Sequence, residues 1–535
     1  MIPVADFRLA VMLRRLGLAL VAAGAVWGAG AVSAQEVLGQ AIARMSADNG
    51  TLAAFYKATG YRPIWVGSAN RKRAAAYLEA LYGAGAHGLP VASYRAGDLA
   101  AALRGGAEPQ ALARAEVAFS TSFAKYARDV QSGVLTPQRV DREIFRRAPR
   151  RDPVKTLSAF AQSSPAAFLR ALPPQTREYQ RLMAEKARLE RELGAGGWGA
   201  QVPGAVFKPG QSGAAVTALS ARLAAMGYLR GTRSDYGADV EQAVAAFQRD
   251  HGLSTDGIAG KVTLSEVNKD PEDRLKQVIA AMERERWLNL PLGKRHVEVN
   301  IPDFTARIID NGRTVFATRA VVGANQSTHR TPEFSDVMEF MVINPTWNVP
   351  ASITAREYLP MLKENPNAVP QLQLVDASGR TVSRGSVDFS AYDGGSFPYR
   401  LKEPPSEGNA LGQVKFMFPN QHNIYLHDTP AKSLFSRESR AYSHGCIRLN
   451  DPQDFAYQLL GPQTANPQGF YQSQVATGRE TVVELSQPLR VHLLYRTAFA
   501  LDGDRVQYRR DVYGRDAKVF AALARAGVSL RAVDG

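Results

Sequence analysis

The first third of the chain carries apolar residues with the period of an α-helix. The segment "RAEVAFSTSFAKYARDVQSGVL" begins at Arg114 and repeats apolar side chains at steps of three and four residues: Val117, Phe119, Phe123, Tyr126 and Val130. A second segment, "KRAAAYLEALYGAGAHGLP", ends in glycines and Pro90, which are typical of a helix terminus. The charged stretch "YQRLMAEKARLERELGAGG" is also closed by glycines. We therefore expect a helical domain over residues 35–196, with an arginine-rich connection at 141–155.

A short linker, "GWGAQVPG", separates this domain from a second helical unit over residues 205–268. Two amphipathic segments, "SGAAVTALSARLAAMGYL" and "DVEQAVAAFQRDHGL", are followed by a glycine-containing turn and a third, shorter helical pattern. Three helices in about 60 residues are enough for a small independent bundle.

From about residue 290 the period of the pattern changes from helix to strand. "RHVEVNI", "FTARIID" and "TVFATRAVVG" alternate apolar and polar residues, and Asn311–Gly312 between the last two is a strong hairpin signal. We expect a mostly-β domain over 290–495. A polar, Pro- and Gly-rich insertion interrupts it at about 351–405, and a C-terminal extension over 496–535 could pack on the first helical domain. The chain is thus predicted to be a multidomain α+β protein.

Residues 1–34 have the layout of a secretory signal peptide. Arg8, Arg14 and Arg15 precede an uncharged stretch, Leu16–Val32, and small residues follow up to Ala34. An uncleaved inner-membrane anchor is the alternative, but the stretch is short and rich in alanine and glycine, which favours cleavage. We expect export to the periplasm, by either the Sec or the twin-arginine route.

The formal net charge of +15 is distributed along the chain and indicates an anionic partner. Export, and the lack of a dense Lys/Arg tract with interleaved aromatic residues, argue against nucleic acid as that partner. A polyanionic polymer of the cell envelope fits the expected compartment better.

Cys446, in "YSHGCIRLN", is the only cysteine in 535 residues. Exported proteins usually pair their cysteines, so a lone thiol is inert and buried, shared with another chain, or chemically used. Gly445 before it allows backbone to approach the sulfur closely. Thiol catalysis also requires a base and donors for an oxyanion, and histidines lie nearby.

Two histidines are candidates for that base. His444 is two residues from Cys446, whereas His427 lies 19 residues upstream at the end of a predicted strand, which would fix its ring better, so we favour His427. The Asp428 side chain should point to the opposite strand face, which leaves a backbone carbonyl to orient the imidazole. A zinc site built from these four residues lacks usual ligand spacing and is disfavoured, so no metal or cofactor is expected. Surface or packing roles are expected for the remaining histidines: His87, His251, His296, His329, His422 and His492.

The segment from His427 through "SHGCIRLN" resembles the catalytic motif of the L,D-transpeptidases. In that motif a histidine precedes Ser/Thr-His-Gly-Cys by a short spacer, which here is residues 428–442. "INPTWNVPASI", "GNALGQVKFMFPN" and "DVYGRD" are similar to the long Gram-negative type that carries a scaffold. "FYKATGYRPIW" and "HGLPVASY" resemble that type's α-helical scaffold, and 205–268 resembles a peptidoglycan-binding three-helix domain. One departure is Arg448, where some members of the family carry Asn.

The resemblance implies a β-sandwich catalytic domain and a role for each motif residue. Cys446 would attack the third residue of a tetrapeptide stem, expel the terminal D-Ala, and pass the acyl group to another stem as a 3–3 cross-link. His427 would be the base, oriented by the backbone carbonyl of Asp428. The resemblance implies carbapenem β-lactams as inhibitors, and a lid role for the insertion. The other implied site residues fall in two groups, which are the oxyanion and donor-site residues Ser443, His444 and Gly445 and the substrate-contacting residues Arg448, Tyr425, Trp347 and Asn348.

Other functions remain open on the sequence. Water in place of an acceptor amine would make the same site an L,D-carboxypeptidase or a cross-link hydrolase, and a lipoprotein acceptor would make it an anchoring enzyme. A non-catalytic wall-binding scaffold is a third possibility, which the complete Ser-His-Gly-Cys motif with its upstream histidine argues against.

Overall fold

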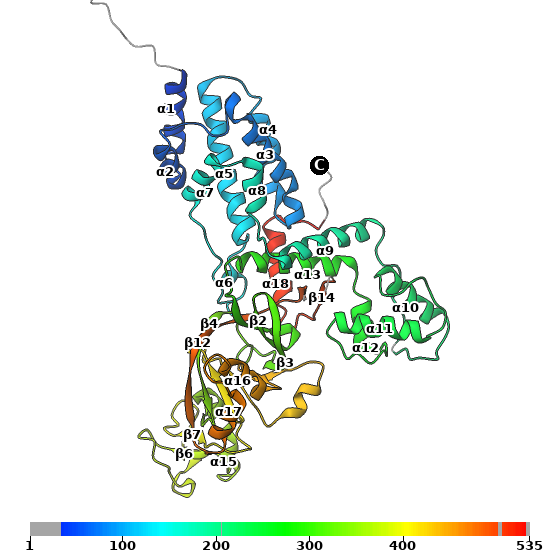
Figure 1. The fold of residues 1–535 in the computed structure, drawn as a ribbon, viewed down its shortest axis with the longest axis vertical. Helices are drawn as coiled ribbons and strands as arrows, with labels where there is room; N and C mark the ends of the chain where they lie inside the picture. The colour runs from blue at the N-terminus through cyan, green and yellow to red at the C-terminus, as the bar shows by residue number, and fades with distance from the viewer. Residues whose placement is uncertain (1–33, 205, 501–504, 531–535) are drawn as a thin grey trace, which may run out of the picture.

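The computed structural model describes residues 34–204, 206–500 and 505–530 (Figure 1). A helical unit lies at one end of the molecule and a β-rich domain at the other. Three small helices project to the side of the helices that join the two ends (Figure 1). No helix within the described ranges is both long and apolar enough to span a bilayer. The predicted signal peptide falls almost entirely on residues 1–33, which lie outside the described residues.

The N-terminal helical unit is packed around a cluster of aromatic rings. Its helices are α1 (Ala34–Ser46), α2 (Gly50–Ala58), α3 (Arg71–Tyr82), α4 (Ala96–Ala102), α5 (Pro109–Ser132), α7 (Pro153–Gln162) and α8 (Pro165–Ala171). Trp65 is fully buried, with its ring centroid 5.1–5.6 Å from the rings of Tyr77, Phe119, Phe123 and Phe160. The apolar face predicted for 114–135 is therefore the buried face of α5, because a helix turns its i, i+3 and i+4 side chains to one side.

The last helix of the predicted first domain packs elsewhere. α9 (Arg177–Gly194) lies along α13 (Pro271–Trp287), and its buried Tyr179, Leu182 and Leu189 share a core with the three-helix unit. The C-terminal extension joins this core through β13 (Ala498–Phe499), β14 (Gln507–Tyr508) and α18 (Arg515–Arg525), which contacts α13 and α6 (Pro137–Val140). α9, α13 and α18 thus form the junction between the two ends of the molecule (Figure 1).

The three-helix unit consists of α10 (Ala214–Ala225), α11 (Ala238–Asp250) and α12 (Lys261–Val267). A buried cation, Arg222, holds it to the start of α13. Its guanidinium donates to the carbonyls of Gly199, Val267 and Lys269 and forms a 2.8 Å ion pair with Asp270. Because these acceptors come from both sides of the unit, Arg222 fixes the unit relative to α13.

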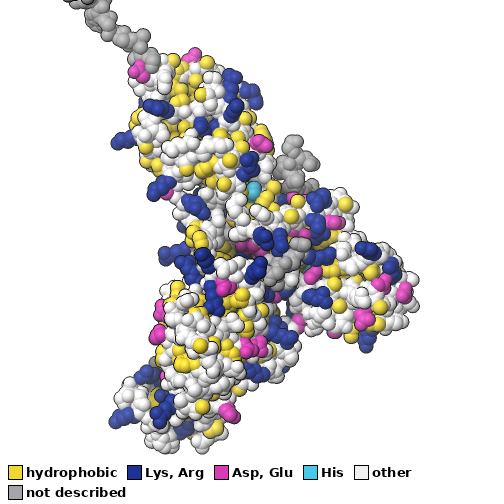
Figure 2. Space-filling model, viewed as in Figure 1, with side chains coloured by type: hydrophobic (Ala, Val, Ile, Leu, Met, Phe, Trp, Pro, Cys, Tyr) yellow, Lys and Arg dark blue, Asp and Glu magenta, His cyan; other side chains and the backbone are white. Residues whose placement is uncertain are grey.

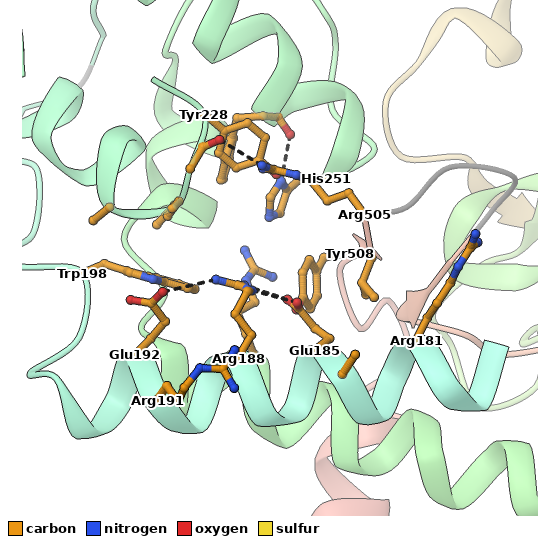
Figure 3. Close-up of a pocket in the computed structure, with 17 residues that line it drawn as sticks. Arg181, Glu185, Arg188, Arg191, Glu192, Trp198, Tyr228, His251, Arg505 and Tyr508 are labelled. Carbon is orange, nitrogen blue, oxygen red and sulfur yellow. Dashed lines mark hydrogen bonds and ion pairs between the residues drawn. The ribbon is translucent and has the colours of Figure 1, made fainter. Parts of the chain in front are cut away.

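A cavity of about 600 Å³ lies between this unit, α9 and the segment that contains β14 (Figure 3). α9 presents charged side chains to it, among them Arg188, which pairs with Glu185 at 2.7 Å. On the opposite wall the Arg505 guanidinium lies 4.1 Å from the centroid of the Tyr228 ring. Cys446 does not line this cavity, so the thiol chemistry belongs to another part of the molecule.

The β-rich domain is built on one nine-stranded sheet in the order β10-β3-β11-β9-β8-β4-β12-β1-β2. Its strands are β1 (Arg295–Asn300), β2 (Thr305–Asp310), β3 (Arg313–Gly323), β4 (Ser335–Ile343), β8 (Val414–Met417), β9 (Leu426–His427), β10 (Ala441–Ser443), β11 (Ile447–Leu449) and β12 (Thr481–Leu494). β2 also pairs with β3, so the sheet closes on itself. α16 (Pro452–Leu460) and α17 (Pro467–Val475) pack on the apolar core. The predicted mixed class of helices and sheet, with one β-rich domain, is confirmed.

The predicted hairpin at Asn311–Gly312 is present between β2 and β3. Both residues have positive φ, 48° and 76°, which is what a type I′ turn requires and what Asn-Gly readily adopts.

The insertion folds around a small core of its own. β5 (Trp347–Asn348), β7 (Arg400–Glu403) and β6 (Gln373–Val375) form a separate three-stranded sheet. It packs with α14 (Ala351–Ile353), a π-helical turn η5 (Thr354–Tyr358) and α15 (Leu359–Glu364). A π-helical turn is rare and is found frequently at functional sites.

Buried ion pairs join the β-rich domain to the helical junction. Glu333, just before β4, accepts from Arg284 of α13 at 2.6 Å and from Arg515 of α18 at 3.3 Å. Arg284 also pairs with Asp516, and Arg515 with Glu143. The side chains of Glu333, Arg284 and Arg515 are almost completely buried. The three segments are therefore held together by charges that have little access to water.

We expect Glu333→Gln to destabilise the protein by about 3–5 kcal/mol, because it removes the buried carboxylate that two buried guanidinium groups share and leaves each with one acidic partner. Urea unfolding, with the free energy extrapolated to water, measures the change. Glu339→Gln, on an exposed side chain of β4, is the matched control and should change stability by less than about 0.5 kcal/mol. Equal effects of the two substitutions would contradict this role for the ion pairs.

Candidate active site

The sheet brings Cys446 and His427 together on neighbouring parallel strands. β9 and β11 pair in parallel with Leu426 opposite Ile447 and His427 opposite Arg448, and the Ile447 amide donates to the Tyr425 carbonyl at 3.0 Å. Side chains two residues apart lie on the same face of a strand. Tyr425 and His427 therefore share one face with Cys446 and Arg448, as the 19-residue separation in the sequence led us to expect.

Contacts between these side chains agree with the strand register. The Cys446 thiol donates to the Asn423 carbonyl at 3.5 Å, and the nearby Tyr425 side chain lowers the pKa of that thiol. The rings of Tyr425 and His427 lie 5.6 Å apart. The positive charge of Arg448 is felt by both Cys446 and His427. Arg448 is half-buried, and its Nε has no hydrogen-bond partner among the described residues.

The loop before Cys446 is fixed by its own hydrogen bonds. Ser443 is buried, and its hydroxyl donates to the Cys446 carbonyl at 2.5 Å. The Ser443 Oγ also accepts a hydrogen bond from the Gly445 amide at 3.1 Å. The Thr331 hydroxyl donates to the Gly445 carbonyl at 2.8 Å. Gly445 has a φ of 116°, in the region that favours glycine, and a Cβ there would lie 3.1 Å from Ile424. Ser443 and Gly445 thus shape the loop rather than exposing polar groups to a ligand.

His427 is buried and oriented by the backbone of the next residue. Its Nδ1 lies 2.5 Å from the Asp428 carbonyl oxygen. Since a carbonyl only accepts, Nδ1 carries the proton and Nε2 is left as the basic nitrogen. The Asp428 carboxylate instead accepts from the amides of Gln413 and Thr429 and from the Lys432 ammonium. As predicted, the backbone carbonyl of Asp428 orients His427, and the Asp428 side chain is directed to other partners.

The environment keeps both reacting groups neutral at rest. Burial, together with the nearby charges of Arg448 and Lys415, lowers the pKa of His427 to about 3. Cys446 retains some solvent exposure, but the surrounding protein raises the pKa of its thiol to about 11, against the opposing effects of Tyr425 and Arg448. At neutral pH the pair is therefore a thiol beside a neutral imidazole.

Two predicted residues lie in the insertion instead of beside the sulfur. Trp347 and Asn348 form β5, which pairs with Glu403 and Lys402 of β7. The Trp347 ring packs against the insertion core, 6.3 Å from the Tyr358 ring. Trp347 thus has a packing role, and neither residue contributes to the strand pair that carries Cys446.

Three side chains near the catalytic loop were not found from the sequence. Glu357 of η5 contacts His444, and His329, expected to have a surface or packing role, has its ring centroid 4.2 Å from that of His444. Tyr358 lies close enough to Arg448 to influence its pKa. These contacts join segments far apart in the chain, 87 residues in the case of Glu357 and His444, so no local pattern announces them.

Comparisons with known proteins identify three domains. Residues 294–484 match the family described as the L,D-transpeptidase catalytic domain, 212–266 a putative peptidoglycan binding domain, and 50–185 a scaffold domain. A putative L,D-transpeptidase of Haemophilus influenzae is 32% identical over 248 residues, which cover 45% of this chain and 49% of that protein. The chain thus spans about half the length of this curated relative.

Two solved structures were also found. An L,D-transpeptidase of Xylanimonas cellulosilytica is 17% identical with a TM-score of 0.17, covering 55% of this chain and 98% of that one. An L,D-transpeptidase of Stackebrandtia nassauensis is 14% identical with a TM-score of 0.21, covering 55% and 97%. The chain is a multidomain α+β protein, and its candidate active site is the Cys446–His427 pair on the closed sheet. Residues 294–484 match the family of L,D-transpeptidase catalytic domains, so the resemblance predicted from the motif is confirmed for this domain.

The raised pKa of Cys446 predicts how its alkylation depends on pH. Below the thiol pKa the thiolate fraction rises about tenfold per pH unit, so the logarithm of the iodoacetamide rate should climb linearly from about pH 7 to about pH 10. Tyr425→Phe should react more slowly at each pH, because it removes a hydroxyl whose presence lowers the thiol pKa. Tyr442→Phe, an exposed tyrosine nearby, is the control and should behave as wild type. A rate plateau near neutral pH would instead indicate a preformed thiolate–imidazolium pair.

Proposed function

We propose that this protein is a peptidoglycan L,D-transpeptidase that forms 3–3 cross-links through a thioester on Cys446. The observation that carries the proposal is the shared strand face of β9 and β11, on which a thiol and an imidazole with a free Nε2 are neighbours. The catalytic, scaffold and peptidoglycan-binding matches support a cell-wall substrate.

The reaction runs in two acyl transfers. His427 Nε2 takes the Cys446 proton as the sulfur attacks the carbonyl of the third residue of a tetrapeptide stem. The tetrahedral intermediate collapses, the terminal D-Ala leaves as an amine with the proton returned by His427, and a thioester remains. The side-chain amine of a second stem then attacks the thioester and gives its proton to His427. The departing thiolate recovers that proton, which restores the starting enzyme.

Donors for the negative charge of the intermediate are available near the sulfur. The Tyr425 side chain lies near the sulfur, and the Cys446 amide has no hydrogen-bond partner among the described residues. The Gly445 amide is used by Ser443, so it is not available as an oxyanion donor. Donors fixed in a partly buried site stabilise an oxyanion without reorganising during the reaction.

Arg448 is the proposed contact for a carboxylate of the donor stem. Its side chain lies on the catalytic face, is half-buried, and keeps an unpaired Nε. A guanidinium of this kind binds a carboxylate with charge-assisted hydrogen bonds. The insertion, with Tyr358 close to Arg448, would cover the bound donor as a lid.

We further propose that the protein is exported to the periplasm by its N-terminal segment, where the tetrapeptide stems are found. The basic side chains visible in Figure 2 are spread over the whole face of the molecule. A distributed positive charge favours loose association with an anionic wall polymer without a single dense patch.

Cys446→Ala should abolish 3–3 dimer formation from purified tetrapeptide muropeptides, because no other thiol exists in the chain. Cys446→Ser keeps the size of the side chain and should also be inactive or nearly so, because a serine hydroxyl next to this imidazole is a far weaker nucleophile. Chromatography and mass spectrometry of the products give the answer. Dimers formed by either variant at the wild-type rate would rule the mechanism out. Tripeptide monomers alone from the wild type would favour a hydrolase, and no turnover at all a binding scaffold.

A carbapenem should acylate the wild-type protein once, which gives a single added mass on the intact chain. The adduct should be absent from Cys446→Ala and slow to form in His427→Asn, since the base that activates the thiol is lost. An adduct that survives the loss of Cys446 would move the nucleophile to another residue.

A further inference from the structure

Three possible metal ligands from separate segments meet beside the catalytic loop. His329 comes from the turn between β3 and β4, Glu357 from η5 of the insertion, and His444 from the loop that precedes Cys446. Their ligand atoms all lie within 4.8 Å of one another. The Glu357 carboxylate contacts His444 Nε2, and the two imidazole rings are 4.2 Å apart at an angle of 66°.

Two of the three side chains are carried by backbone that is already fixed. The His329 amide donates to the Gln326 carbonyl at 2.9 Å, and the next turn is tied to the catalytic loop by Thr331. The His329 carbonyl packs so closely on Gly323 that a Cβ there would lie 1.9 Å from it. The imidazoles are therefore presented by a braced pair of loops, and binding would need adjustment mainly of Glu357.

The ligand set selects a class of metal ion. Two imidazoles with one carboxylate suit Zn²⁺ and other divalent transition metals, whereas Ca²⁺ and Mg²⁺ prefer oxygen ligands. All three side chains keep access to solvent, so an ion can enter and water can complete the coordination. Arg356 adds a positive charge near the site and repels a cation. Coordination by the imidazoles must therefore supply most of the affinity for the metal ion.

We propose that His329, Glu357 and His444 bind one divalent transition-metal ion, such as Zn²⁺, which pins the insertion to the catalytic loop. The ion would link η5 to His444, two positions from Cys446, and so hold the insertion against the catalytic loop. As a consequence, Zn²⁺ should slow acyl transfer. This expected slowing is the only part of the inference that rests on the proposed function. The set differs from the His427–Cys446 pair, which keeps its own hydrogen bonds.

The test is a Zn²⁺ titration of the full chain, purified without a histidine tag and stripped of metal. We expect one Zn²⁺ per chain in the wild type and unchanged binding in Cys446→Ala. His329→Gln should lose at least about tenfold in affinity, and His422→Gln, another partly exposed histidine of the same domain, should lose none. Wild-type affinity in His329→Gln would overturn the site. Loss of binding in Cys446→Ala would also overturn it, since the ion would then sit on the sulfur.

Two further readouts complete the test. The Co²⁺-loaded protein should lack the near-ultraviolet thiolate-to-metal charge-transfer band, and a strong band would contradict the ligand set. Hydrogen exchange over residues 351–364 should slow on addition of Zn²⁺ to the wild type and not to His329→Gln. Metal binding without that slowing would overturn the pinning of the insertion. Because none of these measurements uses turnover, a failure of the cross-linking assay leaves them interpretable.

Discussion

The candidate site depends on the parallel pairing of two very short strands, β9 and β11. That pairing sets His427 opposite Arg448 and so puts the imidazole and the thiol on one face, although 19 residues separate them in the chain. Two hydrogen bonds then fix the reacting groups. One turns the His427 ring through the Asp428 carbonyl, and the other closes the loop before Cys446 through Ser443. A shift of register by one residue would turn either group to the opposite side of the sheet.

The rest of the molecule holds this pairing in place. The sheet closes through β2 and β3, and buried ion pairs at Glu333 attach it to α13 and α18. The insertion carries its own core and reaches the catalytic loop through Glu357. Burial holds the thiol and the imidazole neutral, and the proposed mechanism therefore couples activation of the sulfur to proton transfer within the pair.

Local features of the structure could be predicted from the sequence, and contacts between distant segments could not. The apolar face of α5, the turn at Asn311–Gly312 and the carbonyl partner of His427 all follow from patterns within a few residues. The docking of α9 on α13 and the closure of the sheet join segments that are distant in the chain. The periodicity of each segment predicts a helix or a strand but does not indicate which partner it packs against.

The site shows the same division between local and distant contacts. Cys446 and His427 lie within one recognisable motif. Glu357 and His329 come from other segments, and a single Glu or His in such a segment gives no sign that it lies at the site. The resemblance implies a substrate contact for Trp347, yet its ring packs in the insertion core. Residue type and spacing thus indicated the chemistry, and tertiary packing determined which neighbours surround it.

The central claim is that Cys446 carries the acyl group, and trapping that intermediate tests it most directly. The wild-type protein would be mixed with a tetrapeptide donor, quenched in acid, and examined by intact-protein and peptide mass spectrometry. The account predicts an added tripeptide-stem acyl group, the donor less its terminal D-Ala, on the peptide that contains Cys446, released by hydroxylamine. Accumulated product with no acyl group on Cys446, or an acyl group on another residue, would contradict it.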